Sequence, residues 1–219
     1  VDKNIVHLQS LCDKAKIANR PHIKTHKSPF LAHKQLQAGA IGITCQKLGE
    51  AEVMADAGIE DILITTNIIG AARSGRLTAL QRRMSVKLCA DNPISLEAYA
   101  KAGRDAGRPV RVLIECDTGR KRAGVVTPNE AVGLANTIRD NPWLEFGGLM
   151  FYPPTHSWPA TQTFLDVTKQ GLNCLGLMPE IISTGGTPNL VNLGHLKGAT
   201  EHRSGTYIFN DRMMMAAGL

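Results

Sequence analysis

Residues 38–66 have the sequence AGAIGITCQKLGEAEVMADAGIEDILITT, which contains one helical segment between two apolar ones. The pair Ala38-Gly39 is expected to end a preceding helix, because glycine suits the left-handed backbone at a helix C-cap. An apolar strand, 41–46, follows it. The pair Ala57-Gly58 repeats this ending before a second apolar strand, 61–66. The stretch therefore predicts a strand, a helix and a second strand in succession.

The same unit recurs along the whole chain. We predict eight strands, near His22–Lys24 and at 41–46, 61–66, 86–90, 110–116, 147–152, 180–184 and 205–209. Strands that alternate with helices pair in parallel through right-handed crossovers, and eight such units close into a (β/α)8 barrel of the TIM type. A doubly wound open sheet is the alternative, but no Gly-x-Gly-x-x-Gly follows the first strand. The expected fold is α/β, with one barrel domain over residues 1–219.

The composition is typical of a soluble globular protein, with 43% apolar and 20% charged residues. The net charge is +6, but the basic residues are dispersed and aromatics are only 5%, so we expect no nucleic-acid partner. No apolar run approaches the roughly 20 residues of a membrane span, so we expect no membrane partner and a cytoplasmic location. The five cysteines are scattered without a Cys-x-x-Cys pair and are expected to be reduced.

A loop able to bind phosphate is expected after the seventh strand. In (β/α)8 barrels, functional groups lie at the C-terminal ends of the strands, and phosphates are often held after strands seven and eight. The seventh predicted strand, 180–184, leads directly into Gly185-Gly186-Thr187, whose backbone can approach a phosphate closely. The alternative is that the two glycines only form a tight turn before Pro188.

A dense polar group ends the first predicted strand, at Arg20–Lys27. Burial of Lys24 beside the cations His22, His26 and Lys27 would lower its pKa and leave a neutral amine able to form a Schiff base. A solvated basic loop is the alternative. A lysine across a barrel from a phosphate loop suits an aldehyde cofactor that carries a phosphate.

Residues 20–27 resemble the Arg-Pro-His-x-Lys-Thr-His-Lys signature of the D-threonine aldolase and D-serine dehydratase family of fold-type III pyridoxal-phosphate enzymes. The resemblance continues in order through four further segments, Gly49–Glu52, Asp117–Gly124, Ser183–Pro188 and Glu201–Tyr207. It implies an alanine racemase-like N-terminal barrel with pyridoxal 5′-phosphate as its cofactor.

The resemblance also implies roles for individual residues. Lys24 matches the lysine of the internal aldimine, and Arg122 resembles the catalytic arginine that approaches the cofactor's phenolic oxygen, although a surface ion pair is its alternative. Tyr152 matches a tyrosine near the cofactor ring, and Tyr207 would lie beside the phosphate loop; either could instead be a core residue. His22 is expected near the aldimine. Thr184, Gly185, Gly186 and Thr187 would be parts of the phosphate cup.

The resemblance further implies a divalent metal, zinc or manganese, bound by a C-terminal β domain. The chain starts without Met inside a predicted helix and ends at Leu219 after a Met-rich run, so we expect it to be a fragment that lacks that domain. The lone His156, His195 and His202 lack the paired spacing of metal ligands, so no metal ligand is expected here. Relatives are usually dimers, and a homodimer is expected at full length.

The implied reaction is retro-aldol cleavage of a β-hydroxy-D-amino acid, such as D-threonine to glycine and acetaldehyde. The barrel motifs are more similar to this aldolase branch. The alternative is a D-serine dehydratase, which forms pyruvate and ammonia; an amino-acid racemase and a non-catalytic pyridoxal-phosphate carrier are further alternatives. Tyr152 is followed by Pro153-Pro154-Thr155-His156, where relatives usually carry a Gly-containing stretch. This departure leaves the substrate side chain open.

Overall fold

The computed structural model describes residues 1–209, 212 and 216; the rest of the expected domain lies outside the described part. The strands are β1 (Ala18–Asn19), β2 (Ile43–Cys45), β3 (Ile62–Ile64), β4 (Lys87–Ala90), β5 (Val110–Cys116), β6 (Leu144–Phe151), β7 (Ile181–Gly185) and β8 (Glu201–Arg203). The α-helices are α1 (Asp2–Ala15), α2 (Pro29–Gln37), α3 (Leu48–Asp56), α4 (Ala71–Arg83), α5 (Pro93–Ala106), α6 (Pro128–Arg139) and α7 (Trp158–Cys174). Three short 3-10 helices are η1 (Ile23–Thr25), η2 (Thr187–Asn192) and η3 (Thr206–Ile208).

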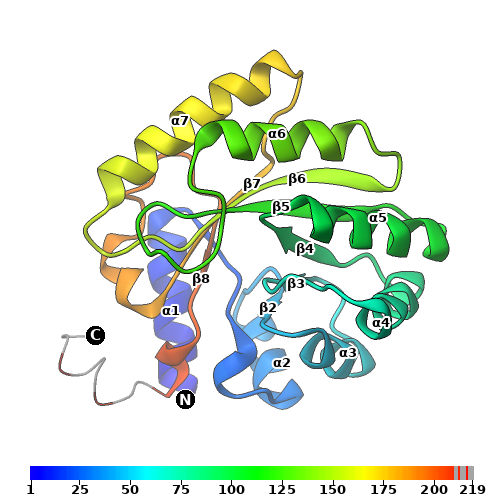
Figure 1. Ribbon diagram of the computed structural model, residues 1–219. Helices are drawn as coiled ribbons and strands as arrows, with labels where there is room; N and C mark the ends of the chain where they lie inside the picture. The colour runs from blue at the N-terminus through cyan, green and yellow to red at the C-terminus, as the bar shows by residue number, and fades with distance from the viewer. Residues whose placement is uncertain (210–211, 213–215, 217–219) are drawn as a thin grey trace.

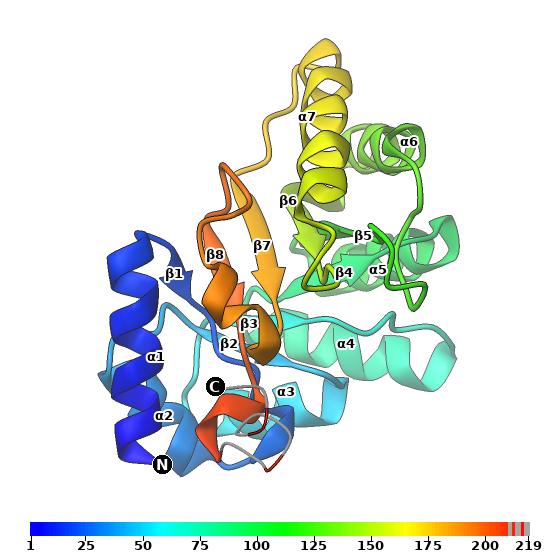
Figure 2. The same ribbon diagram turned by 90° about the vertical axis from the view of Figure 1, so that its left-hand side faces the viewer.

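The eight strands form one parallel sheet that closes on itself. Neighbours pair in the order β1-β8-β7-β6-β5-β4-β3-β2. The two end strands are joined where the amide of Ile41 donates to the carbonyl of Asn19 at 2.9 Å and that of Thr44 to Pro21 at 2.8 Å. The helices follow one another around the strands, as Figures 1 and 2 show. The expected (β/α)8 barrel is therefore confirmed, although η2 rather than an α-helix connects β7 to β8.

Two of the predicted strands are misplaced. The first is predicted at His22–Lys24, but β1 lies before it and residues 23–25 form η1. The last is predicted at 205–209, but β8 lies before that segment, which contains η3. Both true strands carry little apolar pattern, because polar side chains beside them are buried against one another. Arg20, just after β1, donates from Nε to the Glu201 carboxylate of β8 at 2.7 Å.

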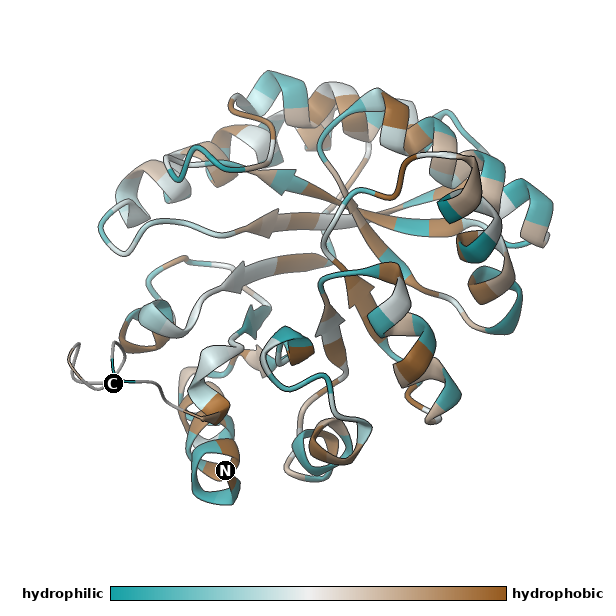
Figure 3. Cartoon of the chain, turned by 60° about the horizontal axis from the view of Figure 1, so that its bottom comes forward, coloured by the Kyte–Doolittle hydropathy of each residue, from teal (hydrophilic) through white to brown (hydrophobic). Residues whose placement is uncertain are grey.

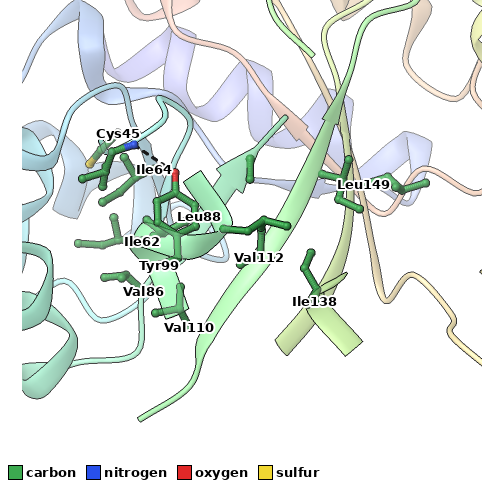
Figure 4. Close-up of a cluster of buried hydrophobic side chains, with 14 of the residues drawn as sticks. Cys45, Ile62, Ile64, Val86, Leu88, Tyr99, Val110, Val112, Ile138 and Leu149 are labelled. Carbon is green, nitrogen blue, oxygen red and sulfur yellow. Dashed lines mark hydrogen bonds between the residues drawn. The ribbon is translucent and has the colours of Figure 1, made fainter. Parts of the chain in front are cut away.

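Alternate residues of β3, β4, β5 and β6 serve two separate apolar layers. Ile62 and Ile64 of β3 pack between the strands and the outer helices, where Figure 4 shows them near Tyr99. The Tyr99 hydroxyl donates to the carbonyl of Cys89 at 2.9 Å, which ties α5 to β4. Successive strand residues point to opposite faces, so Leu63 belongs to the second layer, inside the barrel: Leu63, Cys89, Leu113 and Met150.

The distribution of hydrophobic residues is that of a globular protein. Brown, hydrophobic colour runs along several strands in Figure 3, whereas teal segments recur on the surrounding helices. All five cysteines are free and only Cys174 is exposed. Among the helices of the described residues, none combines the length and apolar character needed to cross a membrane.

Candidate active site

A cavity of about 340 Å³ lies at the C-terminal ends of the strands, where barrels of this type place their functional groups. Residues that follow β1, β2, β3, β5, β6, β7 and β8 line it. Seven of the nine predicted site residues are among them: His22, Lys24, Arg122, Tyr152, Gly185, Gly186 and Thr187. The barrel thus brings together four segments that are far apart in the sequence.

The other two predicted residues do not line the cavity. The Thr184 hydroxyl lies 2.9 Å from Nδ1 of the buried His202. The Tyr207 hydroxyl accepts a hydrogen bond from Nε2 of Gln35 at 2.7 Å, in the packing between α2 and η3. The backbone amide of Tyr207 donates to the Thr187 hydroxyl at 3.2 Å. In this geometry Thr184 and Tyr207 support the walls of the cavity from behind.

Lys24 lies on η1, the short helix that follows β1 along the chain. Its amide donates to Nδ1 of His22, the residue that caps this short helix, at 3.4 Å. Burial lowers the pKa of the Lys24 amine, and the nearby Arg122 and Arg203 guanidinium groups lower it further, against a smaller opposing effect of Glu50. The lowered pKa of Lys24 agrees with the sequence analysis. The cations that contribute to it, however, come from other strands rather than from the neighbours of Lys24 in sequence.

His22 and Lys27 are expected from the sequence to lower the pKa of Lys24 as neighbouring cations, but the structure gives them other roles. The Lys27 amine is 3.4 Å from the Glu50 carboxylate. Burial lowers the pKa of His22 to about 3, and Lys24 and Arg203 contribute to this shift. His22 is therefore neutral at physiological pH and does not repel the lysine beside it.

Arg203 and Glu115 are among the charged residues of the cavity to which the sequence analysis assigns no role. Arg203 is buried and donates to the Phe151 carbonyl at 3.0 Å and to the Ser183 hydroxyl. Burial raises the pKa of Glu115 to about 7, although the positive charge of Arg203 opposes this shift. Arg203 lies in the segment Glu201–Tyr207, which carries part of the family resemblance. The sequence analysis nevertheless assigns no role to this arginine. Glu115 has no local signal, because its surroundings come from other strands.

The loop after β7 has a backbone that only glycine adopts readily. Gly186 has φ = +104°, and a Cβ added to it would lie 2.6 Å from Cε2 of Tyr152. Its amide donates to the carbonyl of Arg203 at 2.8 Å, so this amide, expected to face a phosphate, is already engaged. A phosphate here would meet other groups of the wall, such as Thr187 and Thr206.

Tyr152 is covered by two arginines from the loop after β5. The guanidinium carbon of Arg120 lies 3.9 Å from the centre of the Tyr152 ring, and that of Arg122 lies 6.0 Å from it. Arg120 also donates to the carbonyls of Tyr152 and Pro153, at 3.0 and 3.1 Å. Such cation–π contacts stabilise a ring and a cation together. Sequence analysis gives Arg120 no role, because its partners lie in the loop after β6.

The described residues contain no group of three or more His, Cys, Asp or Glu side chains placed to hold a metal ion. Most of the charged groups of the cavity are instead cationic. Four cations line it, Lys24, Arg120, Arg122 and Arg203, with two carboxylates, those of Glu115 and Asp117. Asp117 accepts hydrogen bonds from the backbone amides of Gly119, Arg120 and Arg122, at 2.9, 2.7 and 3.0 Å. This excess of cations suits an anionic ligand.

Comparisons with known proteins agree with this geometry. The family model described as alanine racemase, N-terminal domain, matches residues 1–213. A D-threonine aldolase from Arthrobacter sp. is 32% identical over 96% of this chain and 58% of its own length. A D-threo-3-hydroxyaspartate dehydratase from Delftia sp. (strain HT23) is 32% identical over 100% of the chain and 61% of its own length.

Solved structures give the same result. The crystal structure of D-threonine aldolase from Filomicrobium marinum superposes with a TM-score of 0.93 at 29% identity, covering 100% of this chain and 62% of that one. The chain therefore spans about three fifths of the length of the relatives it matches.

Proposed function

Because the chain belongs to the alanine racemase N-terminal domain family, we propose that it is the cofactor-binding barrel of a pyridoxal 5′-phosphate-dependent lyase. The proposed reaction is retro-aldol cleavage of a β-hydroxy-D-amino acid to glycine and an aldehyde. The observation that carries the proposal is the amine of Lys24, with its lowered pKa, in one cavity with the loop Gly185–Thr187. Similarity to the D-threonine aldolases supports the choice of reaction.

The residues of the cavity fit this cofactor. The lining has more cations than carboxylates, as an aldehyde with a phosphate group requires, and glycine at position 186 lets the loop after β7 pack directly against Tyr152 in the cavity wall. Thr187 and Thr206, beside the glycines at 185 and 186, would hold the phosphate, and Lys24 would be the point of covalent attachment. When bound, the cofactor supplies an electron sink for the charge that develops at the substrate α-carbon.

The chain's own residues would prepare the site for this chemistry. A lysine with a lowered pKa is neutral more often at physiological pH, so its Nζ can attack a carbonyl and can accept and return a proton. The guanidinium groups of Arg122 and Arg203 offer fixed donors to negative oxygens or to a ring nitrogen. Neutral His22, whose Nδ1 accepts the Lys24 amide, positions η1.

Dehydration of the same class of substrate is the second candidate. One observation favours it: the Delftia dehydratase matches the whole chain at the same 32% identity as the Arthrobacter aldolase. The two reactions use the same lysine and phosphate loop. They differ in which bond breaks, Cα–Cβ in the aldolase and Cβ–O in the dehydratase.

Part of the proposal concerns the full-length protein. Manganese or zinc, bound by a C-terminal β domain, would assist at the β-hydroxyl, and the protein would be a cytoplasmic homodimer. The support is the family resemblance together with the matched share of the relatives, about three fifths. Removal of the metal by a chelator should abolish turnover, and readdition of Mn²⁺ should restore it.

The direct test uses the full-length protein with pyridoxal 5′-phosphate and Mn²⁺. D-Threonine and D-serine are offered in separate reactions, and the products are identified by mass spectrometry. Glycine and acetaldehyde from D-threonine support the aldolase. Pyruvate from D-serine, without glycine from D-threonine, would support the dehydratase instead. Absence of turnover with either, and with 3-hydroxy-D-aspartate, would refute the proposed lyase.

A further inference from the structure

We propose that Arg120 selects substrates with a second carboxylate, carried on the side chain of the β-hydroxy-D-amino acid. The inference rests on the proposed lyase function and narrows it to 3-hydroxyaspartate-type substrates. Arg120 is not among the residues that the family resemblance assigned. Its side chain bridges two loops whose sequences, Asp117–Gly124 and Tyr152–His156, lie on opposite sides of β6 along the chain.

Arg120 reaches the same cavity as Lys24. The cavity, at about 340 Å³, is near the lower end of the usual range for small-molecule sites, roughly 300–1,000 Å³. A small amino acid held near Lys24 therefore lies close to most lining groups. A charge that enters a space of this size lies near the charges of the wall and interacts with them electrostatically.

The guanidinium group of Arg120 is fixed without an acidic partner. Its two hydrogen-bond acceptors, the carbonyls of Tyr152 and Pro153, are neutral, and its third contact is the face of the Tyr152 ring. Within the described part of the chain, Arg120 forms no ion pair. The nearby Asp117 carboxylate is occupied by backbone amides.

The contacts that Arg120 makes with the described residues use Nε and Nη2 and leave Nη1 for a ligand. A half-buried cation with unused N–H groups in a planar arrangement matches a carboxylate, which can accept two of them side by side. The side-chain carboxylate of a 3-hydroxyaspartate-type substrate supplies this partner, whereas the methyl group of threonine does not. The three remaining cations that line the cavity, Lys24, Arg122 and Arg203, are left for the cofactor and the α-carboxylate.

Arg120 is also held in place relative to the proposed cofactor loop. The Pro153 carbonyl, which accepts from Arg120, also accepts from Nδ2 of Asn189 at 3.0 Å. The same Asn189 amide donates to the carbonyl of Gly185 at 2.8 Å. The Asn189 side chain thus links the Pro153 carbonyl, to which Arg120 donates, to the loop Gly185–Thr187. A carboxylate that binds such a preorganised cation loses less affinity to side-chain ordering.

The test compares three variants of the cofactor-loaded, full-length protein. Arg120→Gln removes the charge but keeps an amide that can donate to a carbonyl. Arg120→Lys keeps the charge but loses the planar fork. Lys121→Gln is the control, because it removes one positive charge from an exposed neighbour that does not line the cavity. The kcat/KM of each is measured with 3-hydroxy-D-aspartate and with D-threonine.

Arg120→Gln should lower kcat/KM for 3-hydroxy-D-aspartate about 10- to 100-fold, mainly through KM, the effect typical of a lost charge-assisted hydrogen bond. For D-threonine it should change by less than about 3-fold. The kcat/KM of Arg120→Lys for 3-hydroxy-D-aspartate should lie between that of Arg120→Gln and that of the unaltered protein. Lys121→Gln should have the same kcat/KM as the unaltered protein. Equal losses for both substrates in Arg120→Gln would mean that Arg120 only fixes the loop, which overturns the inference.

Binding of unreactive acids provides a second readout. Succinate and propionate carry no amine and cannot react, so calorimetry reports binding alone. The dissociation constant of succinate should rise about 10-fold or more in Arg120→Gln, while that of propionate stays the same. Cleavage of D-threonine without action on 3-hydroxy-D-aspartate would overturn the inference and leave the lyase intact. If no substrate turned over, the lyase proposal would fail, and the succinate titration would still decide the role of Arg120.

Discussion

The Gly186→Ala substitution perturbs one point of the loop after β7 that both the backbone and a neighbouring ring define. Gly186 has φ = +104°, a region that residues with a Cβ rarely adopt. The added methyl group would lie 2.6 Å from Cε2 of Tyr152, well inside the roughly 3.5–4.0 Å of an ordinary carbon contact. The ring cannot move away freely, because Arg120 covers its face at 3.9 Å.

The Gly186→Ala substitution should lower both the stability of the protein and its affinity for the cofactor. The unfavourable backbone conformation should lower the free energy of unfolding by about 1–3 kcal/mol. The displacement of Tyr152 or of the loop, about 1 Å judged from the contact above, should remove at least one charge-assisted hydrogen bond to the cofactor. This loss corresponds to a dissociation constant for pyridoxal 5′-phosphate that is about 10- to 100-fold higher.

Gly70→Ala is the matched control. Gly70 has φ = +100° and precedes α4 in the way that Gly186 precedes η2, but a Cβ added to Gly70 would meet no described atom within 4 Å. Both variants should lose stability in urea unfolding, Gly186→Ala at least as much as Gly70→Ala, and only Gly186→Ala should bind the cofactor weakly in an absorbance titration. If both variants bound the cofactor equally well, Gly186 would not belong to the cofactor site.

Two further predictions concern stability. Arg20→Met leaves the buried Glu201 carboxylate without its cation and should cost about 3–5 kcal/mol in urea unfolding, whereas Arg76→Met, which breaks an exposed pair, should cost less than about 1 kcal/mol; similar losses would contradict this assignment. His22 and His202 have pKa values lowered to about 3, mainly by burial, so both are neutral in the folded protein. Because the unfolded chain takes up these protons below about pH 6.5, stability should be complete above that pH and should fall toward pH 3, by about 1 kcal/mol per pH unit for each histidine. Unfolding curves at pH 7, 6 and 5 measure this slope, and substitution of His202 by Gln should reduce it; an unchanged slope would contradict the role of burial.

The barrel is predictable because its inner strands are apolar and its helices end in small residues. The predicted strand 110–116 agrees with β5, and β2, β3, β4 and β7 lie within about a residue or two of their predictions. The closing strands are misplaced because their surroundings are charged. Arg20 and Glu201 compensate each other only after the two ends of the chain meet. A local pattern cannot show such a long-range ion pair.

The site is predictable where a single segment carries the signal. The motifs around Lys24 and Gly185–Thr187 indicate the lining of one cavity. The cause of the lowered pKa of Lys24 is not predictable, since Arg122 and Arg203 reach it from other strands. The contact between Arg120 and Tyr152 is missed for the same reason, because it joins two different loops.

The central claim is that Lys24 holds an aldehyde cofactor in the barrel cavity. The direct measurement is borohydride reduction of the full-length protein loaded with pyridoxal 5′-phosphate, followed by digestion and mass spectrometry. We predict that the pyridoxyl-phosphate mass is found on Lys24 and that Lys24→Ala yields no reduced adduct. An adduct on another lysine, such as Lys27, or a trappable linkage that persists in Lys24→Ala, would contradict the claim.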